Sequence, residues 1–271
     1  MPRRFAFLAA ALLSLWSLSA RAQDAQPSTC QAIAEAIPKA TFASLEVEPP
    51  TWLAARDAGE VAITFVQHST YLIRSPAGVT IATDYSGFSG DTVPRIATMN
   101  KAHSTHYTNH PDPGIEYVLR GWNPAGGAAH HNLSVDDVLV RNVPSDIRNW
   151  GGGVEKDGNS IFVFETAGLC IGHLGHLHFE LTDAQFAAIG RLDVVMVPVD
   201  GGYTMSQGSM AAMVERLQSR VVLPMHNFRG RMDEFLGRLP DFAVERIAGP
   251  TLTLSPKSLP KRPTVILLDG V

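Results

Sequence analysis

The chain has 271 residues, of which 22 are basic and 26 acidic, so its formal net charge is -4. Because no stripe of Lys and Arg interrupts this acidic balance, nucleic acid is not expected as a partner or substrate. Beyond the N-terminal leader, no segment stays apolar for the roughly 18 residues that a membrane span needs, so stable membrane insertion is not expected either.

The first 22 residues have the pattern of a secretory signal peptide. MPRRFAFLAAALLSLWSLSARA combines two early arginines, a short apolar run broken by serines, and a small-residue exit ending at Ala22. A membrane anchor is the alternative, but the apolar run is too short for it. Cleavage would remove three arginines and no acid, which moves the formal charge from -4 to -7. We therefore expect a periplasmic or secreted protein.

The rest of the chain divides into a lead-in and one domain. Residues 23–58 are rich in Ala and Pro, with a short helical stretch near residues 31–40, and residues 59–271 are expected to form one domain. Cys30 and Cys170 are the only cysteines. An oxidising compartment permits them to pair, but a lone cysteine in a predicted strand, such as Cys170, is more often a small buried apolar side chain. The sequence leaves both possibilities open.

Short β-rich runs come first and helical patterns follow. Strands are expected at 61–66, 70–74, 79–84, 137–143, 160–168, 169–175, 193–200 and 221–226. Helices are expected at 182–192, 206–220 and 231–239, from N-cap residues and apolar spacing. The segment 143–159, with three consecutive glycines, is expected to be an irregular loop. This order predicts packed sheets with helices outside them.

Histidines recur at the ends of predicted strands. All ten lie between residues 68 and 226, and seven of them gather as His103, His106 and His110, as His173, His176 and His178, and as His226. A single histidine is usually a satisfied surface or core residue. Groups at several strand ends favour a metal site instead, since histidine is the commonest metal ligand and strand ends are where sites gather.

Six segments, taken in order, resemble the metallo-β-lactamase-fold hydrolases, in particular the branch that includes ascorbate-6-phosphate lactonase-like proteins. They are FVQHSTYLI (65–73), IATD (81–84), KAHSTH (101–106), HLGHL (173–177), VPVDGGYTM (197–205) and LPMH (223–226). The resemblance runs from about Val61 to His226. It implies an α/β (α+β) fold, a four-layer αββα sandwich, with metals in a cleft along one edge of the two sheets.

The metal motif departs from the family pattern. KAHSTH stands where the family has His-x-His-x-Asp-His, so His103 and His106 match, whereas Lys101 and Thr105 replace a histidine and the aspartate. No histidine between 132 and 172 supplies the family's loop ligand. One of the two metal positions would keep only His103, and we expect it to be empty.

The other metal position is expected to hold one ion, most simply zinc. There His176 falls on the family's bridging aspartate and His226 on its last ligand, so His106, His176 and His226 would form the site. Three neutral imidazoles and a water make a chemically sensible catalytic centre. His103, His173 and His178 are expected to be reserve ligands or partners that fix the ligands' tautomers.

Three further residues are candidates for catalysis. Lys101 would replace lost metal charge and bind a substrate anion or a developing oxyanion, although a surface lysine is the alternative. Asp84 and Asp200, at strand ends, would orient histidines or accept a proton, although turn acids are the alternative. His68, in QHST, is expected to be structural or to support the ligands.

These residues favour an exported hydrolase with a metal-activated water. Its substrate would be a small molecule with an ester, lactone, amide or phosphoester bond, and the sequence does not choose among these. A catalytically silent periplasmic protein that binds a small ligand is the main alternative. Metal-free catalysis by Lys101 and a histidine ranks third.

Overall fold

The structure is a computed structural model of the chain, and it describes residues 28–31, 59–149, 151–228 and 230–271. The predicted signal peptide (1–22) lies outside these residues. So does most of the lead-in, including nearly all of its expected helix.

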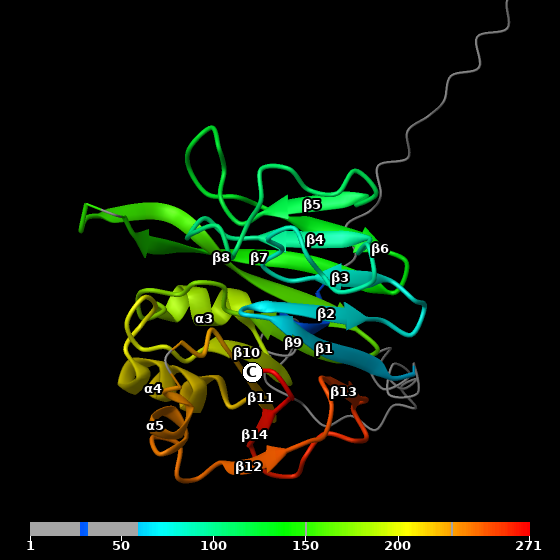
Figure 1. The fold of residues 1–271 in the computed structure, drawn as a ribbon, viewed down its shortest axis with the longest axis vertical. Helices are drawn as coiled ribbons and strands as arrows, with labels where there is room; N and C mark the ends of the chain where they lie inside the picture. The colour runs from blue at the N-terminus through cyan, green and yellow to red at the C-terminus, as the bar shows by residue number, and fades with distance from the viewer. Residues whose placement is uncertain (1–27, 32–58, 150, 229) are drawn as a thin grey trace, which may run out of the picture.

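Two mixed β-sheets form the body of the molecule (Figure 1). Within the described residues, the six-stranded sheet has the spatial order β13 (Thr251–Leu254), β1 (Val61–Gln67), β2 (Thr70–Arg74), β3 (Thr80–Ala82), β4 (Ile96–Met99) and β5 (Tyr117–Arg120). The eight-stranded sheet has the order β12 (Ala243–Arg246), β14 (Thr264–Leu267), β11 (Val221–Met225), β10 (Val194–Pro198), β9 (Leu169–His173), β8 (Val154–Thr166), β7 (Val138–Arg148) and β6 (Asn132–Val135).

The main core lies between the two sheets. Alternate residues of β1, such as Ile63, are buried in one apolar cluster with Phe162 and Phe164 of β8. Successive side chains of a strand point to opposite faces, so this alternation presents one face of each sheet to the other. Each fully buried side chain of this size contributes about 1.5–3 kcal/mol, which fixes the two sheets against each other.

Helices cover the outer face of the eight-stranded sheet. α3 (Asp183–Ile189), α4 (Gln207–Leu217) and α5 (Met232–Leu236) bury residues in a second cluster with Val195 and Val222 of that sheet. The predicted N-caps are confirmed: Thr182 forms a capping box with Gln185, and Ser206 accepts the Ser209 N–H. All three helices were expected from the sequence.

The metallo-β-lactamase-type fold is confirmed as two mixed sheets with few helices. The outer helix layer on the six-stranded sheet is the exception, because the described part of the chain places no helix there. Ala97 and Met99 of β4 pack instead with Tyr85, Ile115 and Trp122, which lie in loops. Loop side chains thus bury this face.

The expectation of an irregular loop at 143–159 is wrong. β7 and β8 pair as far as Arg148 and Val154, with a register shift between Ser145 and Ile147, and Figure 1 shows this hairpin extending past the neighbouring strands. Near the tip, Asn149 Oδ1 accepts the N–H groups of Gly151 and Gly153. Pairing across the hairpin outweighs the weak local strand propensity of this segment.

Residues 28–31 are tied to the eight-stranded sheet. Cys30 forms a disulfide with Cys170 of β9, which settles the question that the sequence left open. The buried carboxylate of Glu165 accepts hydrogen bonds from the Ser28 hydroxyl and the Cys30 N–H, and it pairs with Arg141. The start of the described chain therefore belongs to the folded domain. In the described segments, every helix falls short of the length and apolar character required to cross a bilayer.

Candidate metal centre

Four histidines converge at one edge of the two sheets. His68, His103, His106 and His226 each offer a ring nitrogen, and these nitrogens lie within 4.8 Å of one another. His68 occupies the turn between β1 and β2, His103 and His106 follow β4, and His226 follows β11. The cluster therefore joins the ends of strands from both sheets.

The backbone at these strand ends adopts uncommon torsions. His68, Asp84 and His226 have φ of 45°, 41° and 55°, a left-handed region that is costly for side chains other than Gly, Asn and Asp. The His226 N–H donates to the His68 carbonyl at 2.8 Å, which holds the two strand ends together. Packing thus holds two of the clustered histidines in strained conformations, as is common at functional sites.

Asp84 fixes the ring of His106. Its Oδ2 lies 2.6 Å from His106 Nδ1, its Oδ1 accepts Asn100 Nδ2–H at 2.8 Å, and Ser69 Oγ lies 3.0 Å from the same ring nitrogen. Since a carboxylate only accepts, the proton of His106 is on Nδ1 and the lone pair is on Nε2. Burial opposes ionisation of Asp84, but His173 and His106 and these hydrogen bonds outweigh it and lower the pKa of the carboxyl.

Asp200 stands in the same relation to His226. Its Oδ1 lies 3.0 Å from His226 Nδ1, although the contact does not have the direction of a well-formed hydrogen bond. Its Oδ2 accepts the N–H groups of Gly202 and Thr204 at 2.8 and 3.2 Å, which shapes the glycine-rich turn. Burial opposes ionisation, but the contact with His226 and these hydrogen bonds lower the pKa of Asp200. The negative charge favours a proton on His226 Nδ1 and a lone pair on Nε2.

His68 and His103 complete the cluster as neutral rings. Burial, followed by repulsion from neighbouring histidines, lowers the pKa of His68 to about 3 and that of His103 to about 4. Thr105 Oγ1 lies 2.8 Å from His103 Nδ1. A ring that stays neutral at pH 7 keeps a lone pair for a metal without first losing a proton.

The donor set fits a divalent metal ion. The Nε2 atoms of His68, His106 and His226 are buried and have no hydrogen-bond partner among the described residues. Buried polar atoms are almost always paired, so three unpaired ones in a single cluster call for an explanation. Imidazole nitrogens within 4.8 Å of one another can share one ion, and the carboxylates behind His106 and His226 give the support typical of ligating histidines.

The structure changes the predicted ligand set. His106 and His226 are in the cluster as expected, and so is His103, which was expected as a reserve. His176 is a neighbour, with its ring centre 4.7 Å from that of His106, but it is not in the group whose nitrogens lie within 4.8 Å of one another. His68 takes the fourth place. The sequence reasoning gave it only a supporting role, although its position at a strand end was the signal that could have found it.

His173 lies outside the group of four histidines, and both of its ring nitrogens have partners. Its Nε2 donates to the Ser69 carbonyl at 2.9 Å, and its Nδ1 accepts the Gly175 N–H at 3.1 Å. Both ring nitrogens are therefore occupied, and burial lowers the pKa of the ring. His173 instead holds Ser69, the residue that contacts His106.

Lys101 also departs from its expected role. Its half-exposed ammonium pairs with Glu155 on the β7–β8 hairpin and not with any member of the histidine cluster. Arg148, which lies close to the position where the family's loop ligand was expected, donates to the carbonyls of Tyr203 and Thr204. Both cations thus have partners outside the histidine cluster. Asp84 and Asp200 lie against the rings of His106 and His226, and their orienting role stays a prediction.

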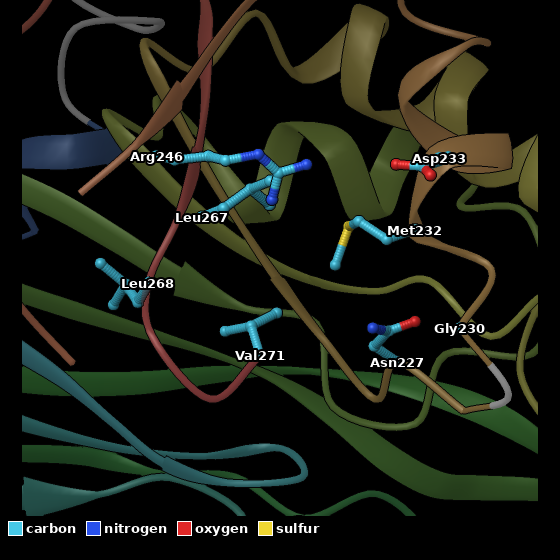
Figure 2. Close-up of a pocket in the computed structure, with 8 residues that line it drawn as sticks. All are labelled: Asn227, Gly230, Met232, Asp233, Arg246, Leu267, Leu268 and Val271. Atoms are coloured by element: carbon cyan, nitrogen blue, oxygen red, sulfur yellow. The ribbon is translucent and has the colours of Figure 1, made fainter. Parts of the chain in front are cut away.

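A separate pocket is lined by residues that follow β11 and by residues of α5, β12 and the C-terminal segment (Figure 2). It is lined by Asn227, Gly230, Met232, Asp233, Arg246, Leu267, Leu268 and Val271. None of the clustered histidines contributes to it. The chemistry at the sheet edge, and not this pocket, therefore defines the candidate site.

The comparison with known protein families agrees with this geometry. Residues 62–226, more than half of the chain, match the β-lactamase superfamily domain. The chain belongs to the metallo-β-lactamase superfamily. The matched range begins in β1 and ends at His226, so it contains all four clustered histidines.

Individual members of the superfamily are similar to this chain. A metal-dependent hydrolase of the UPF0173 group from Pyrococcus abyssi is 29% identical over 114 residues, which are 42% of this chain and 47% of the relative. The match thus spans about half the length of that protein. A proposed Zn-dependent hydrolase of the superfamily from Thermotoga maritima has a solved structure with a TM-score of 0.59 and 25% identity, covering 77% of this chain and 98% of that one.

The fold is also shared with a more distant member. The metallo-β-lactamase fold protein YhfI from Bacillus subtilis has a TM-score of 0.50 at 10% identity, and the match covers 78% of this chain and 98% of that one. This similarity supports the fold alone.

Proposed function

We propose that this superfamily member is an exported metal-dependent hydrolase of small molecules, with one divalent ion, most simply zinc, held by His68, His103, His106 and His226. The observation that carries the proposal is the convergence of three buried, unpartnered Nε2 atoms, those of His68, His106 and His226. The hydrolase names of the relatives from Pyrococcus abyssi and Thermotoga maritima support it.

The four histidines would hold the ion, and Asp84 and Asp200 would orient two of these ligands. A divalent ion at such a site lowers the pKa of water and polarises an acyl or phosphoryl oxygen. Asp84 keeps the proton of His106 on Nδ1, and Asp200 favours the same arrangement at His226. His103 is half-buried, with Nδ1 next to the exposed Thr105, so it marks the side from which a substrate enters.

The bond that is cleaved belongs to the class of small-molecule esters, lactones, amides or phosphoesters. The loss of two family carboxylates, replaced by Thr105 and His176, favours a silent protein, which would bind a small ligand without turnover.

Export rests on the leader sequence and on the disulfide. Residues 1–22 have the three parts of a signal peptide, and the Cys30–Cys170 disulfide is a bond that persists in oxidising compartments. We propose a periplasmic or secreted location, with a small-molecule substrate and without a nucleic-acid partner or stable membrane insertion.

The test compares chelator-stripped protein with the same protein after one equivalent of zinc is added. Hydrolysis of lactone, ester, amide and phosphoester substrates should be absent in the first sample and present in the second. Zinc that binds without turnover of any substrate would favour the silent binding protein. Turnover that is unchanged after stripping would refute the metal-dependent mechanism.

A further inference from the structure

We propose that His176 is a hydrogen-bond donor to a substrate oxygen and not a metal ligand, because a chain of hydrogen bonds through His178 places the His176 ring proton on Nε2. The proposal deepens the proposed function, since it assigns a substrate contact to the same site. It concerns the residue that falls on the family's bridging metal ligand.

The chain of hydrogen bonds starts at a backbone amide. The Arg148 N–H donates to His178 Nδ1 at 2.5 Å. A ring nitrogen that accepts a hydrogen bond carries no proton, so His178 is neutral and its single ring proton is on Nε2.

The next bond passes this constraint on to His176. His178 Nε2 lies 2.7 Å from His176 Nδ1. Because His178 Nε2 carries the proton, it is the donor and His176 Nδ1 is the acceptor. The proton of neutral His176 is therefore on Nε2. This tautomer is the reverse of the one that Asp84 imposes on His106, where Nδ1 is protonated and Nε2 has the free lone pair.

The main chain fixes the position of His176. Its N–H donates to Asn159 Oδ1 at 2.8 Å, and the preceding Gly175 has a φ of +61°. A Cβ at Gly175 would lie 2.4 Å from both Asn100 Nδ2 and Asn159 Oδ1, so only glycine fits there. The ring of His176 is thus held against the cluster by a turn with little freedom to move.

The Nε2–H of His176 is available to a ligand. This atom is buried and has no hydrogen-bond partner among the described residues, while the ring centre lies 4.9 Å from that of His103 and 4.7 Å from that of His106. The neighbouring ring nitrogens are not partners for His176 Nε2–H, because their lone pairs are directed to a metal or they already take part in hydrogen bonds. A carbonyl, carboxylate or phosphoryl oxygen that enters the cluster would accept this hydrogen bond.

Nitrogen-15 NMR of the ring nitrogens tests the tautomer directly, in metal-free protein at neutral pH. We expect a protonated Nε2 in both His176 and His178, and a protonated Nδ1 in His106. A proton on His178 Nδ1 would break the chain and overturn the proposal. A His178→Ala variant should lose the single tautomer of His176.

Metal and phosphate binding test the role. Zinc affinity of His176→Gln should stay within about threefold of the wild type, whereas the matched variant His106→Gln should lose at least about tenfold. The affinity of the zinc-loaded protein for inorganic phosphate should fall about tenfold in His176→Ala, because one hydrogen bond to a charged group is lost. The affinity should recover in His176→Gln, because the glutamine amide replaces the donor.

The outcomes separate this proposal from the proposed function. Loss of zinc in His176→Gln, or equal phosphate binding in the wild type and both His176 variants, would overturn the donor role while leaving the metal site intact. Absence of zinc binding in the wild-type protein would refute the proposed function, and the NMR result would still decide the tautomer of His176.

Discussion

Replacing Asp84 by Asn should separate metal binding from folding more clearly than any other single change. Asn tolerates the left-handed backbone at this position, where φ is 41°, so torsional strain is not added. The change removes the buried charge that accepts the His106 Nδ1–H at 2.6 Å. Loss of such a support behind a ligating histidine typically costs about 10- to 100-fold in metal affinity, or about 1.4–2.7 kcal/mol.

The structure also predicts a cost in stability. Asp84 Oδ1 accepts Asn100 Nδ2–H, and Asn100 cannot flip because its own Oδ1 accepts the Ser160 N–H at 2.7 Å. If the amide oxygen of the introduced asparagine accepts the His106 Nδ1–H, its NH2 group points at the NH2 group of Asn100, and two donors then face each other. One buried donor is left unpaired in either orientation, which costs about 1–3 kcal/mol in the free energy of unfolding.

Competition with a chromogenic zinc chelator measures the affinity, and urea unfolding of the metal-free protein measures the stability. Glu165→Gln is the matched control. It removes another buried carboxylate, paired with Arg141 far from the cluster, and should lower stability without changing zinc affinity. Equal zinc affinity in Asp84→Asn and wild type would refute the assignment of His106 as an oriented ligand.

Three further outcomes follow from the structure. The double variant Cys30→Ala, Cys170→Ala opens a covalent link across a sequence separation of 140, and urea unfolding should show a loss of about 2–5 kcal/mol; an unchanged midpoint would contradict the disulfide. Metal-free protein should unfold at a lower temperature at pH 4.5 than at pH 7. Folding lowers the pKa values of His68 and His103 from 6.5 to about 3 and 4, so the unfolded chain takes up more protons than the folded one as the pH falls. A higher unfolding midpoint at pH 4.5 than at pH 7 would be inconsistent with neutral buried rings. Lys101→Ala should change zinc affinity by less than about twofold in the chelator assay, because Lys101 is paired with Glu155 in an exposed ion pair, which contributes little free energy. A larger loss of affinity would show that Lys101 acts at the metal site.

Much of the fold follows from local patterns in the sequence. Strands β1 and β10 and the three helices α3, α4 and α5 occur where they were expected. Short strands such as β5 and β12 were not expected, because four residues carry too little periodicity to be distinguished from loops. The extension of β7 and β8 beyond the predicted strands 137–143 and 160–168 was missed, because this pairing depends on a partner strand and not on local propensity.

The site was predicted in part for a similar reason. The histidines were found because they follow strands, but sequence cannot tell which ring nitrogen faces the cluster. His173 and His176 are three residues apart in the sequence. Both ring nitrogens of His173 have hydrogen-bond partners, Ser69 and Gly175, whereas Nε2 of His176 has none among the described residues. The convergence of His68 on His226 depends on contacts between the two sheets, which only the folded structure supplies.

The metal content of His68→Ala tests the central claim most directly. We expect the purified wild-type protein, after loading with zinc and removal of excess, to hold close to one ion per chain by elemental analysis. His68→Ala should lose most of that ion, while His110→Ala, a change at an exposed histidine outside the cluster, should keep it. Full zinc retention by His68→Ala, or no zinc in the loaded wild type, would contradict the four-histidine site.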